Sequence, residues 1–203
     1  MPDGKYENMS DHPVCGIDEV GRAPLAGPVT AACVVIPLEL YTHPVISLLK
    51  DSKALTKNKR EYIFSILAPM VQWALGWVSH KEIDKINIHN ASLLAMQRAH
   101  DALVEKAIFP KTALVDGKFA PQLDCKIRTI IKGDVHSISI SAASIIAKVS
   151  RDNYMNDLAQ QYPHYGWHKN AGYSTRIHID GIKKHGPCPY HRMSFGCLKK
   201  IAV

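Results

Sequence analysis

The chain has 203 residues, of which 46% are hydrophobic, and carries a formal net charge of +7 at pH 7. This length is enough for one substantial hydrophobic core and too short for two typical domains. The basic balance favours a polyanionic partner such as nucleic acid, since each phosphate that a protein contacts releases counterions. No apolar run approaches the length that crosses a membrane.

The first twelve residues are polar and lack the apolar segment of a signal peptide. We therefore expect a soluble, cytoplasmic protein with a frayed N-terminus. Five cysteines are present, without C-x-x-C spacing. Cys15 and Cys33 lie inside apolar segments, which favours buried reduced thiols over disulfides.

Hydrophobic periodicity and turn residues predict strands alternating with helices. The expected strands are a hairpin-like pair at 14–20 and 29–36, a third at 71–79, and two shorter runs at 112–115 and 127–132. The expected helices are 57–67, 90–106 and 138–161, with Pro163 ending the last.

Acidic residues follow three of these strands. Asp18 and Glu19 end the first, Asp116 follows 112–115, and Asp134 follows 127–132. Such acids are often ordinary turn residues, or solvated groups paired with a neighbour such as Arg22. Since strand ends line up along one edge of a sheet, we expect these acids from distant parts of the sequence to converge.

Carboxylates that converge without histidine or cysteine at ligand spacing form an all-oxygen site, which suits magnesium or manganese better than zinc. The predicted chemistry is phosphoryl transfer, in which two metals about 4 Å apart activate a water and stabilise the leaving oxygen. Neighbouring strand residues point to opposite faces, so Asp18 and Glu19 share a site only if the strand bends or ends there. Gly21 permits such a bend.

The motifs of the chain, taken in order from Val14 to about Phe195, resemble the ribonuclease HII family, the type 2 ribonucleases H of bacteria and archaea. The order and spacing of the motifs carry the resemblance more than any one of them. The matching segments are Gly16 to Val29, Asp51-Ser52-Lys53, Asn87 to Met96, Val115-Asp116-Gly117, Lys132-Gly133-Asp134, Ser141 to Asp152, Tyr162 to Tyr173 and Gly186 to Arg192.

The resemblance implies an α/β RNase H-like fold, a mixed central sheet flanked by helices. It implies a single domain over 1–203, with a catalytic core at 14–161 and a helical C-terminal substrate-binding extension at 162–203. The implied activity is metal-dependent endonucleolytic cleavage of RNA in RNA–DNA hybrids and at single ribonucleotides embedded in duplex DNA, leaving 5′-phosphate and 3′-hydroxyl ends. Such enzymes remove misincorporated ribonucleotides and RNA primers in DNA replication and repair, and a monomer is expected.

The family's four active-site acids fall on Asp18, Glu19, Asp116 and Asp134, all present here. By resemblance, the main chain of Gly21-Arg22-Ala23 contacts the ribose 2′-hydroxyl, the group that distinguishes RNA from DNA. The family usually has glycine at position 23. Because Ala23 precedes a proline, its backbone is biased to extended angles that alanine adopts without strain, so we expect recognition to survive with altered efficiency.

By resemblance, Tyr173 stacks on the sugar beyond the cleavage site, although the residue alone is equally consistent with a core tyrosine. Ser144 and Lys148 are placed near the active site or the nucleic-acid backbone. The small residues of 138–161 also suit close packing, and Lys148 and Arg151 share a face that meets either a phosphate or nearby acids. Lys53 is assigned to a phosphate, where the residue alone suggests a solvated lysine.

Many members of the family that the chain resembles carry a lysine and a glycine where this sequence has Ala171 and Ser174, so the resemblance does not extend to that phosphate contact or to the flexibility of this turn. The histidines of this region do not have metal-ligand spacing and are interpreted as surface or packing residues. They are His164, His168, His178, His185 and His191.

Two other functions fit parts of the pattern. A resolvase or exonuclease of the wider RNase H-like group would share the acids without needing elements that read a 2′-hydroxyl. An inert RNA–DNA binding protein would share the charge, but the four intact acids argue against it. Substrate choice and the effect of Asp134→Asn distinguish these alternatives.

Overall fold

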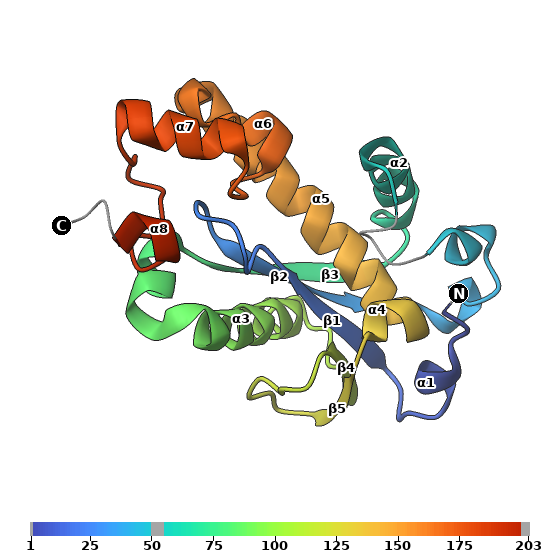
Figure 1. Ribbon diagram of the computed structural model, residues 1–203. Coiled ribbons are helices and arrows are strands. Elements are labelled where there is room, and N and C mark those ends of the chain that lie inside the picture. The colour runs from blue at the N-terminus through green and yellow to red at the C-terminus, as the bar shows by residue number, and fades with distance from the viewer. Residues whose placement is uncertain (1, 50–54, 200–203) are drawn as a thin grey trace.

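The computed structural model describes residues 2–49 and 55–199. Its centre is a five-stranded sheet with strand order β3-β2-β1-β4-β5 (Figure 1). The strands are β1 (Val14–Val20), β2 (Val29–Val35), β3 (Gln72–Val78), β4 (Thr112–Asp116) and β5 (Lys126–Ile130). β1, β2 and β3 pair antiparallel in succession, whereas β4 runs parallel to both β1 and β5. The predicted mixed sheet is therefore confirmed.

Helices cover both faces of the sheet and continue beyond its end, as Figure 1 shows. They are α1 (Lys5–Asn8), α2 (Lys57–Leu67), α3 (His80–Val104), α4 (Gly133–His136), α5 (Ile138–Gln161), α6 (Trp167–Asn170), α7 (Arg176–His185) and α8 (Gly196–Lys199). The 3-10 turns are η1 (Leu38–Leu40), η2 (Pro44–Leu48) and η3 (Pro163–Tyr165). None of the helices in the described part of the chain has the length and apolar character to span a membrane.

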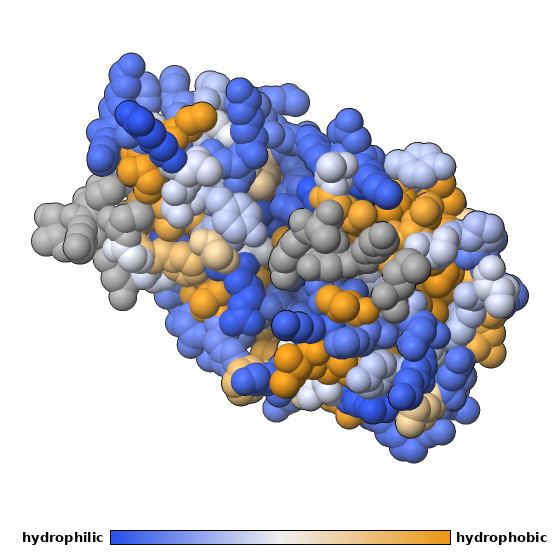
Figure 2. Space-filling view, turned by 45° about the vertical axis from the view of Figure 1, so that its right-hand side comes forward, coloured by the Kyte–Doolittle hydropathy of each residue, from blue (hydrophilic) through white to orange (hydrophobic). Residues whose placement is uncertain are grey.

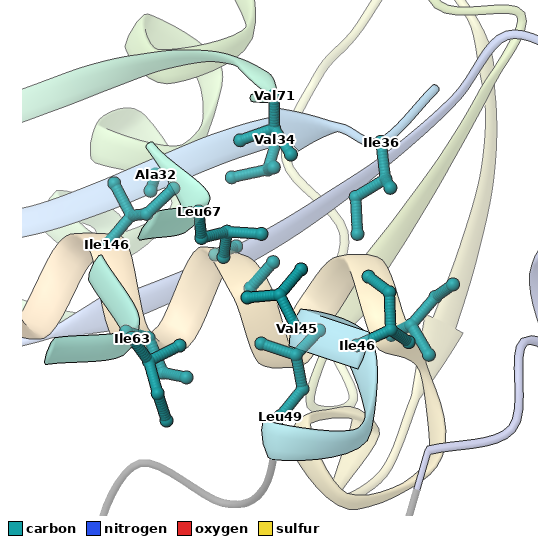
Figure 3. Close-up of a cluster of buried hydrophobic side chains, with 14 of the residues drawn as sticks. Ala32, Val34, Ile36, Val45, Ile46, Leu49, Ile63, Leu67, Val71 and Ile146 are labelled. Atoms are coloured by element: carbon teal, nitrogen blue, oxygen red, sulfur yellow. The ribbon is translucent and has the colours of Figure 1, made fainter. Parts of the chain in front are cut away.

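The alternation of β2 builds a core on each face of the sheet. Ala32 and Val34 pack with Ile146 of α5 and with Ile63 and Leu67 of α2, as Figure 3 shows. The residues between them on β2 face the opposite way and join a second cluster with α3. Successive side chains of a strand point to opposite faces, so one uniformly apolar strand supports both helical layers.

Glycine permits close contact between helix and sheet at two points. A Cβ on Gly16 of β1 would lie 2.1 Å from the carbonyl carbon of Ser139, and a Cβ on Gly76 of β3 would lie 2.0 Å from the carbonyl oxygen of Ala95. The first half of α5 is buried throughout residues 138–147. Close packing therefore accounts for most of its small side chains, and it brings the start of α5 next to β1.

The structure corrects two expectations about element ends. The helix predicted from residue 90 begins at His80, where Ser79 and Glu82 form a capping box, and it is interrupted by non-helical angles at Asn87. The N-terminus is not frayed, because Glu7 of α1 is fully buried and accepts hydrogen bonds from the main chain and hydroxyl of Ser139 at 3.0 and 2.7 Å. A buried carboxylate needs such donors, and they bind α1 to the start of α5.

The C-terminal helices pack on the end of α5 and on the loop after β1. Tyr165, Trp167 and Ile182 form a third cluster with Leu25 and Met155. This arrangement confirms that the last described part of the chain forms helices beyond the sheet. It also brings segments from both ends of the sequence together at the same place.

Replacing Ala171 with glycine is expected to stabilise the protein. Ala171 ends α6 with a φ of +46°, in the left-handed region that costs alanine about 1 kcal/mol. After subtraction of the extra unfolded-state entropy of glycine, the gain is at most about 1 kcal/mol, or a rise in Tm of about 2–4 °C. Thermal unfolding measures the change. Ala102→Gly inside α3 is the control and should lower Tm, and a similar fall for both variants would contradict the expectation.

Candidate active site

The four acids lie at one edge of the sheet. Asp18 and Glu19 are the last acids of β1, and Asp116 is the last residue of the neighbouring parallel strand β4. Asp134 follows β5 within the short helix α4, and not at the strand end itself. Asp18 and Asp134 are only 6% and 7% exposed, so their charges are largely removed from water.

The acids influence one another electrostatically. Burial raises the pKa of Asp18 well above its usual value, and the charges of Glu19, Asp116 and Asp134 raise it further. Burial also raises the pKa of Glu19, against the lowering effect of Arg22, whose Nη1 donates to Glu19 Oε1 at 3.1 Å. The carboxylates at this edge therefore repel one another, and the ion pair with Arg22 opposes this effect at Glu19.

Hydrogen bonds from α5 and from the first residue of α4 orient two of these acids. The Ser144 hydroxyl donates to Asp18, which lowers the pKa of that carboxyl and partly opposes the burial effect. The main-chain N–H of Gly133 donates to Asp116 Oδ1 at 2.6 Å. A Cβ at position 133 would lie 2.5 Å from the Cδ1 of Ile140, so glycine permits this approach.

The donor set suits a hard divalent cation. All four side chains offer carboxylate oxygens, which hard divalent cations prefer as ligands. A cation bound among them would also offset the repulsion between their negative charges. Within residues 2–49 and 55–199, no three acidic, histidine or cysteine side chains already meet at metal-ligand spacing. The acids therefore form a candidate site that a cation would draw together, and not a closed cage.

The Gly21-Arg22-Ala23 loop begins where β1 ends. Gly21 has a φ of +92°, and a Cβ at this position would lie 2.2 Å from the Nε of Arg151. Glycine is therefore required here on two independent grounds. Ala23 is exposed and does not have positive φ, as expected of a residue before proline.

Arg192 binds the main chain of this loop from the protein interior. It is fully buried, and its guanidinium donates to three main-chain carbonyls: Gly21 at 2.6 Å, Arg22 at 3.0 Å and Gly27 at 2.9 Å. Burial lowers its pKa to about 9. We call Arg192 and Arg151 the clamp arginines.

Arg151 connects the same loop to the turn that carries Tyr173. It is fully buried and donates to the carbonyls of Pro28 at 2.9 Å, Ala26 at 3.1 Å and Ala171 at 2.9 Å. The prediction that Arg151 shares with Lys148 a face that meets a phosphate or nearby acids is wrong, because the buried guanidinium of Arg151 donates to main-chain carbonyls instead. Burial lowers the pKa of Arg151 to about 10.

Tyr173 is at the surface and is not a core tyrosine, with 38% of its area exposed. The Nζ of Lys148 lies 5.8 Å from the centre of its ring. Lys148 Nζ also forms an ion pair with Asp152, on the same helix, at 2.8 Å. Lys148 therefore contacts an acid of its own helix while it lies beside the Tyr173 ring. Lys53 lies outside the described residues.

A groove leads away from Tyr173 between α2, α5 and α6. We call it the basic groove, because its lining contains four lysine or arginine side chains and one acid. The charged and histidine residues of the lining are Lys57, Arg60, Lys148, Asp152, His168 and Lys169. Figure 2 shows hydrophilic side chains predominating where the C-terminal helices form this face of the molecule.

Sequence patterns did not single out Arg192 or the buried histidines His178 and His191 as parts of the site, and for Arg151 they suggested a phosphate or nearby acids as partners. The only local signal for Arg151 was a charged residue within a helix of small, buried side chains. Arg192 stands directly after His191 in a stretch without periodicity. Their partners are carbonyls far away in sequence, which no local pattern indicates.

Comparison with known proteins identifies the family of the chain. The sequence model of the Ribonuclease HII family matches residues 15–197. The chain is a member of the ribonuclease HII family. One relative in this family, the ribonuclease HII of Paramagnetospirillum magneticum, is 47% identical over 195 aligned residues. The alignment covers 96% of this chain and 96% of the relative.

Solved structures of ribonucleases H share the fold. The ribonuclease H2 from Pyrococcus horikoshii OT3 superposes with a TM-score of 0.77 at 28% identity, covering 93% of this chain and 96% of that one. Bst-RNase HIII in complex with Mn2+ has a TM-score of 0.73 at 19% identity, covering 93% and 68%. The RNase H-like fold is thereby confirmed, and membership of the ribonuclease HII family makes this chain a ribonuclease H, an endonucleolytic hydrolase.

Proposed function

We propose that the chain cleaves the RNA strand of RNA–DNA hybrids and cuts at single ribonucleotides embedded in duplex DNA, leaving 5′-phosphate and 3′-hydroxyl ends. Asp18, Glu19, Asp116 and Asp134 are the proposed catalytic and metal-binding residues, with magnesium or manganese as cofactor. The proposed role is removal of misincorporated ribonucleotides and RNA primers in DNA replication and repair, by a cytoplasmic monomer.

One observation carries this proposal: four carboxylates that repel one another electrostatically lie beside a main-chain loop that two buried arginines hold in place. A divalent cation held by these acids would supply Lewis-acid activation of water and offset charge on the phosphodiester. The chain itself orients the acids through the Ser144 hydroxyl and the Gly133 N–H. The Mn2+ complex of the related RNase HIII supports the choice of cofactor.

The clamp arginines also explain how the loop could recognise a 2′-hydroxyl. The carbonyls of Gly21 and Arg22 point inward to Arg192. In a trans peptide the N–H points opposite to the carbonyl of the same unit, so the N–H groups of Arg22 and Ala23 are directed away from Arg192. They are the proposed main-chain donors to the ribose hydroxyl, and neither requires a particular side chain at position 23.

The domain organisation that we propose is a single unit with a catalytic core at 14–161 and a substrate-binding extension at 162–203. The support is the third hydrophobic cluster, which joins the C-terminal helices to Leu25 and Met155. The extension supplies Tyr173, and it supplies Arg192 to the Gly21-Arg22-Ala23 loop, which we call the recognition loop. Lys53 remains proposed as a phosphate contact.

The test is cleavage of a labelled DNA duplex containing one ribonucleotide, beside an all-DNA duplex and a long RNA–DNA hybrid, with magnesium and with manganese. We expect cutting at the lone ribonucleotide and none in the all-DNA control. Cutting of the all-DNA duplex would favour a resolvase or exonuclease. No cutting with either metal would favour an inert binding protein.

Replacing Lys169 with alanine is expected to weaken substrate binding without slowing the chemical step. Lys169 lines the basic groove at a distance from the acids, so we expect KM to rise several-fold with kcat unchanged. The slope of log affinity against log salt concentration should fall by about 1. Binding titrations at several salt concentrations measure this. Lys183→Ala on α7, an exposed lysine outside the groove, is the control, and equal effects of both variants would argue against the groove.

A further inference from the structure

Two histidines form a buried pair beneath Tyr173. His178 lies on α7 and His191 follows the loop after it, and their side chains are 0% and 1% exposed. Their Nε2 atoms are 3.0 Å apart. Two imidazole nitrogens at this distance form a hydrogen bond, so one of them must carry a proton and donate it while the other accepts.

The surrounding donors determine which ring does which. The main-chain N–H of Cys188 donates to His191 Nδ1 at 2.9 Å, so that nitrogen carries no proton and the proton of His191 lies on Nε2. The Cys188 carbonyl, 3.2 Å from the same nitrogen, does not alter this, because the position of a main-chain proton is fixed. His191 therefore donates to His178 Nε2.

The second ring follows from the first. Trp167 Nε1, which can only donate, also lies 3.0 Å from His178 Nε2, so this nitrogen carries no proton and its single lone pair is shared between the Trp167 and His191 donors. The proton of a neutral His178 then lies on Nδ1, which is 2.9 Å from the carbonyl oxygen of Tyr173. A continuous series of hydrogen bonds thus runs from Cys188 through His191 and His178 to the main chain of Tyr173.

The environment keeps both rings neutral. Tyr165 packs against His191 with ring centres 4.7 Å apart, Trp167 packs against both rings, and Cys188 adjoins the pair. Burial lowers the pKa of both histidines, and the charges of His178 and His80 lower that of His191 further, to about 4. Protonation of either ring would place two N–H groups face to face or remove the acceptor that Trp167 needs.

We propose that His178 and His191 are positioning residues that hold the main chain of Tyr173, and through it the exposed ring, where the sugar beyond the cleavage site is recognised. This inference rests on the proposed function. The Tyr173 ring has Lys148 beside it but is more than one-third exposed, so its place depends on its main chain. The pair ties that main chain to the loop at Cys188, the segment that also delivers Arg192 to the recognition loop.

Two substitutions of His178 separate its two bonds. In His178→Asn, the side-chain amide nitrogen can take the place of Nδ1 and keep the hydrogen bond to the Tyr173 carbonyl. In His178→Gln, the longer side chain places its amide where Nε2 was, so the bond to Tyr173 is lost. The readout is kcat/KM on the single-ribonucleotide duplex divided by kcat/KM on the long hybrid. We expect His178→Gln to lower this ratio about tenfold, and His178→Asn to stay within about twofold of the wild type. His185→Gln, an exposed histidine on the same helix, is the control.

A merely structural role would lower activity on both substrates equally and leave the ratio unchanged for both variants, which would overturn the proposal. Nitrogen-15 NMR of the imidazoles provides a readout independent of activity. We expect His191 protonated on Nε2, His178 on Nδ1, and neither ring titrating near pH 6.5. Titration near 6.5 would overturn the pair. If the wild type cuts neither substrate, the proposed function is wrong. The NMR measurement then still tests whether His178 and His191 form the hydrogen-bonded pair.

Discussion

Replacing Asp134 with asparagine is expected to reduce cleavage at a single ribonucleotide by at least about 1000-fold while leaving the protein folded and slightly more stable. The loss should be large because removing an outer-sphere partner of a metal ligand already costs about 10–100-fold. The gain in stability follows from electrostatics, since the charge of Asp134 raises the pKa of Asp18, and relieving a repulsion between buried carboxylates favours the folded state.

The measurement combines initial rates in magnesium and in manganese with thermal unfolding in the absence of divalent ions. Tm should rise by about 2–4 °C for each kcal/mol gained. Asp157→Asn, an exposed acid on α5, is the control and should change neither quantity. Unchanged cleavage by Asp134→Asn would favour the alternative function of an inert RNA–DNA binding protein. A fall in Tm would contradict the expected relief of repulsion between the acids.

Replacing Gly21 with alanine is expected to cost several kcal/mol of stability and to abolish the preference for a ribonucleotide. The new Cβ would lie 2.2 Å from the Nε and 2.7 Å from the Cδ of Arg151, and the φ of +92° adds backbone strain of about 1–2 kcal/mol. If Arg151 moves, the carbonyls of Pro28 and Ala171 lose a buried donor, at about 1–3 kcal/mol each.

At about 2–4 °C for each kcal/mol, we expect Tm to fall by roughly 10 °C or more. Residual activity should show little dependence on the 2′-hydroxyl, measured on matched duplexes with and without the ribonucleotide. Ala23→Gly is the matched control, since it alters the same loop at an exposed position without positive φ, and it should keep both the fold and the ribonucleotide requirement. A wild-type chain with no such requirement would contradict the role of the loop.

The strands and the acids could be predicted from the sequence because both depend on local patterns. Apolar runs ending in acid located β1 and β4 closely, and parallel pairing brought Asp18 and Asp116 to the same edge. The helix α3 was predicted too short because its first turns are polar on most sides, and the capping box at Ser79 lies before the apolar pattern begins. Periodicity reports burial, and it fails where a helix starts in solvent.

The clamp arginines and the histidine pair could not be predicted in this way. Arg151 is a good helix former with a charge, so its sequence position suggests a solvated or phosphate-facing side chain. What decides otherwise is that the carbonyls of Ala26 and Pro28, in the loop after β1, accept hydrogen bonds from Arg151, a pairing that only the assembled fold reveals. His178 and His191 meet across a loop whose path no periodicity describes, so their tautomers follow from three-dimensional contacts alone.

The bond from Arg192 to the Gly21 carbonyl spans 171 positions of sequence, which sets an order of events during synthesis. A chain leaves the ribosome from its N-terminus, and its early segments can begin folding before the rest exists. All four acids emerge before α5, yet the loop beside them lacks one of its two arginines until position 192 has been translated. A nascent chain therefore carries the acidic edge before Arg192 can hold the loop beside it, and the ribonucleotide selectivity proposed for that loop would be acquired only in the last steps of translation.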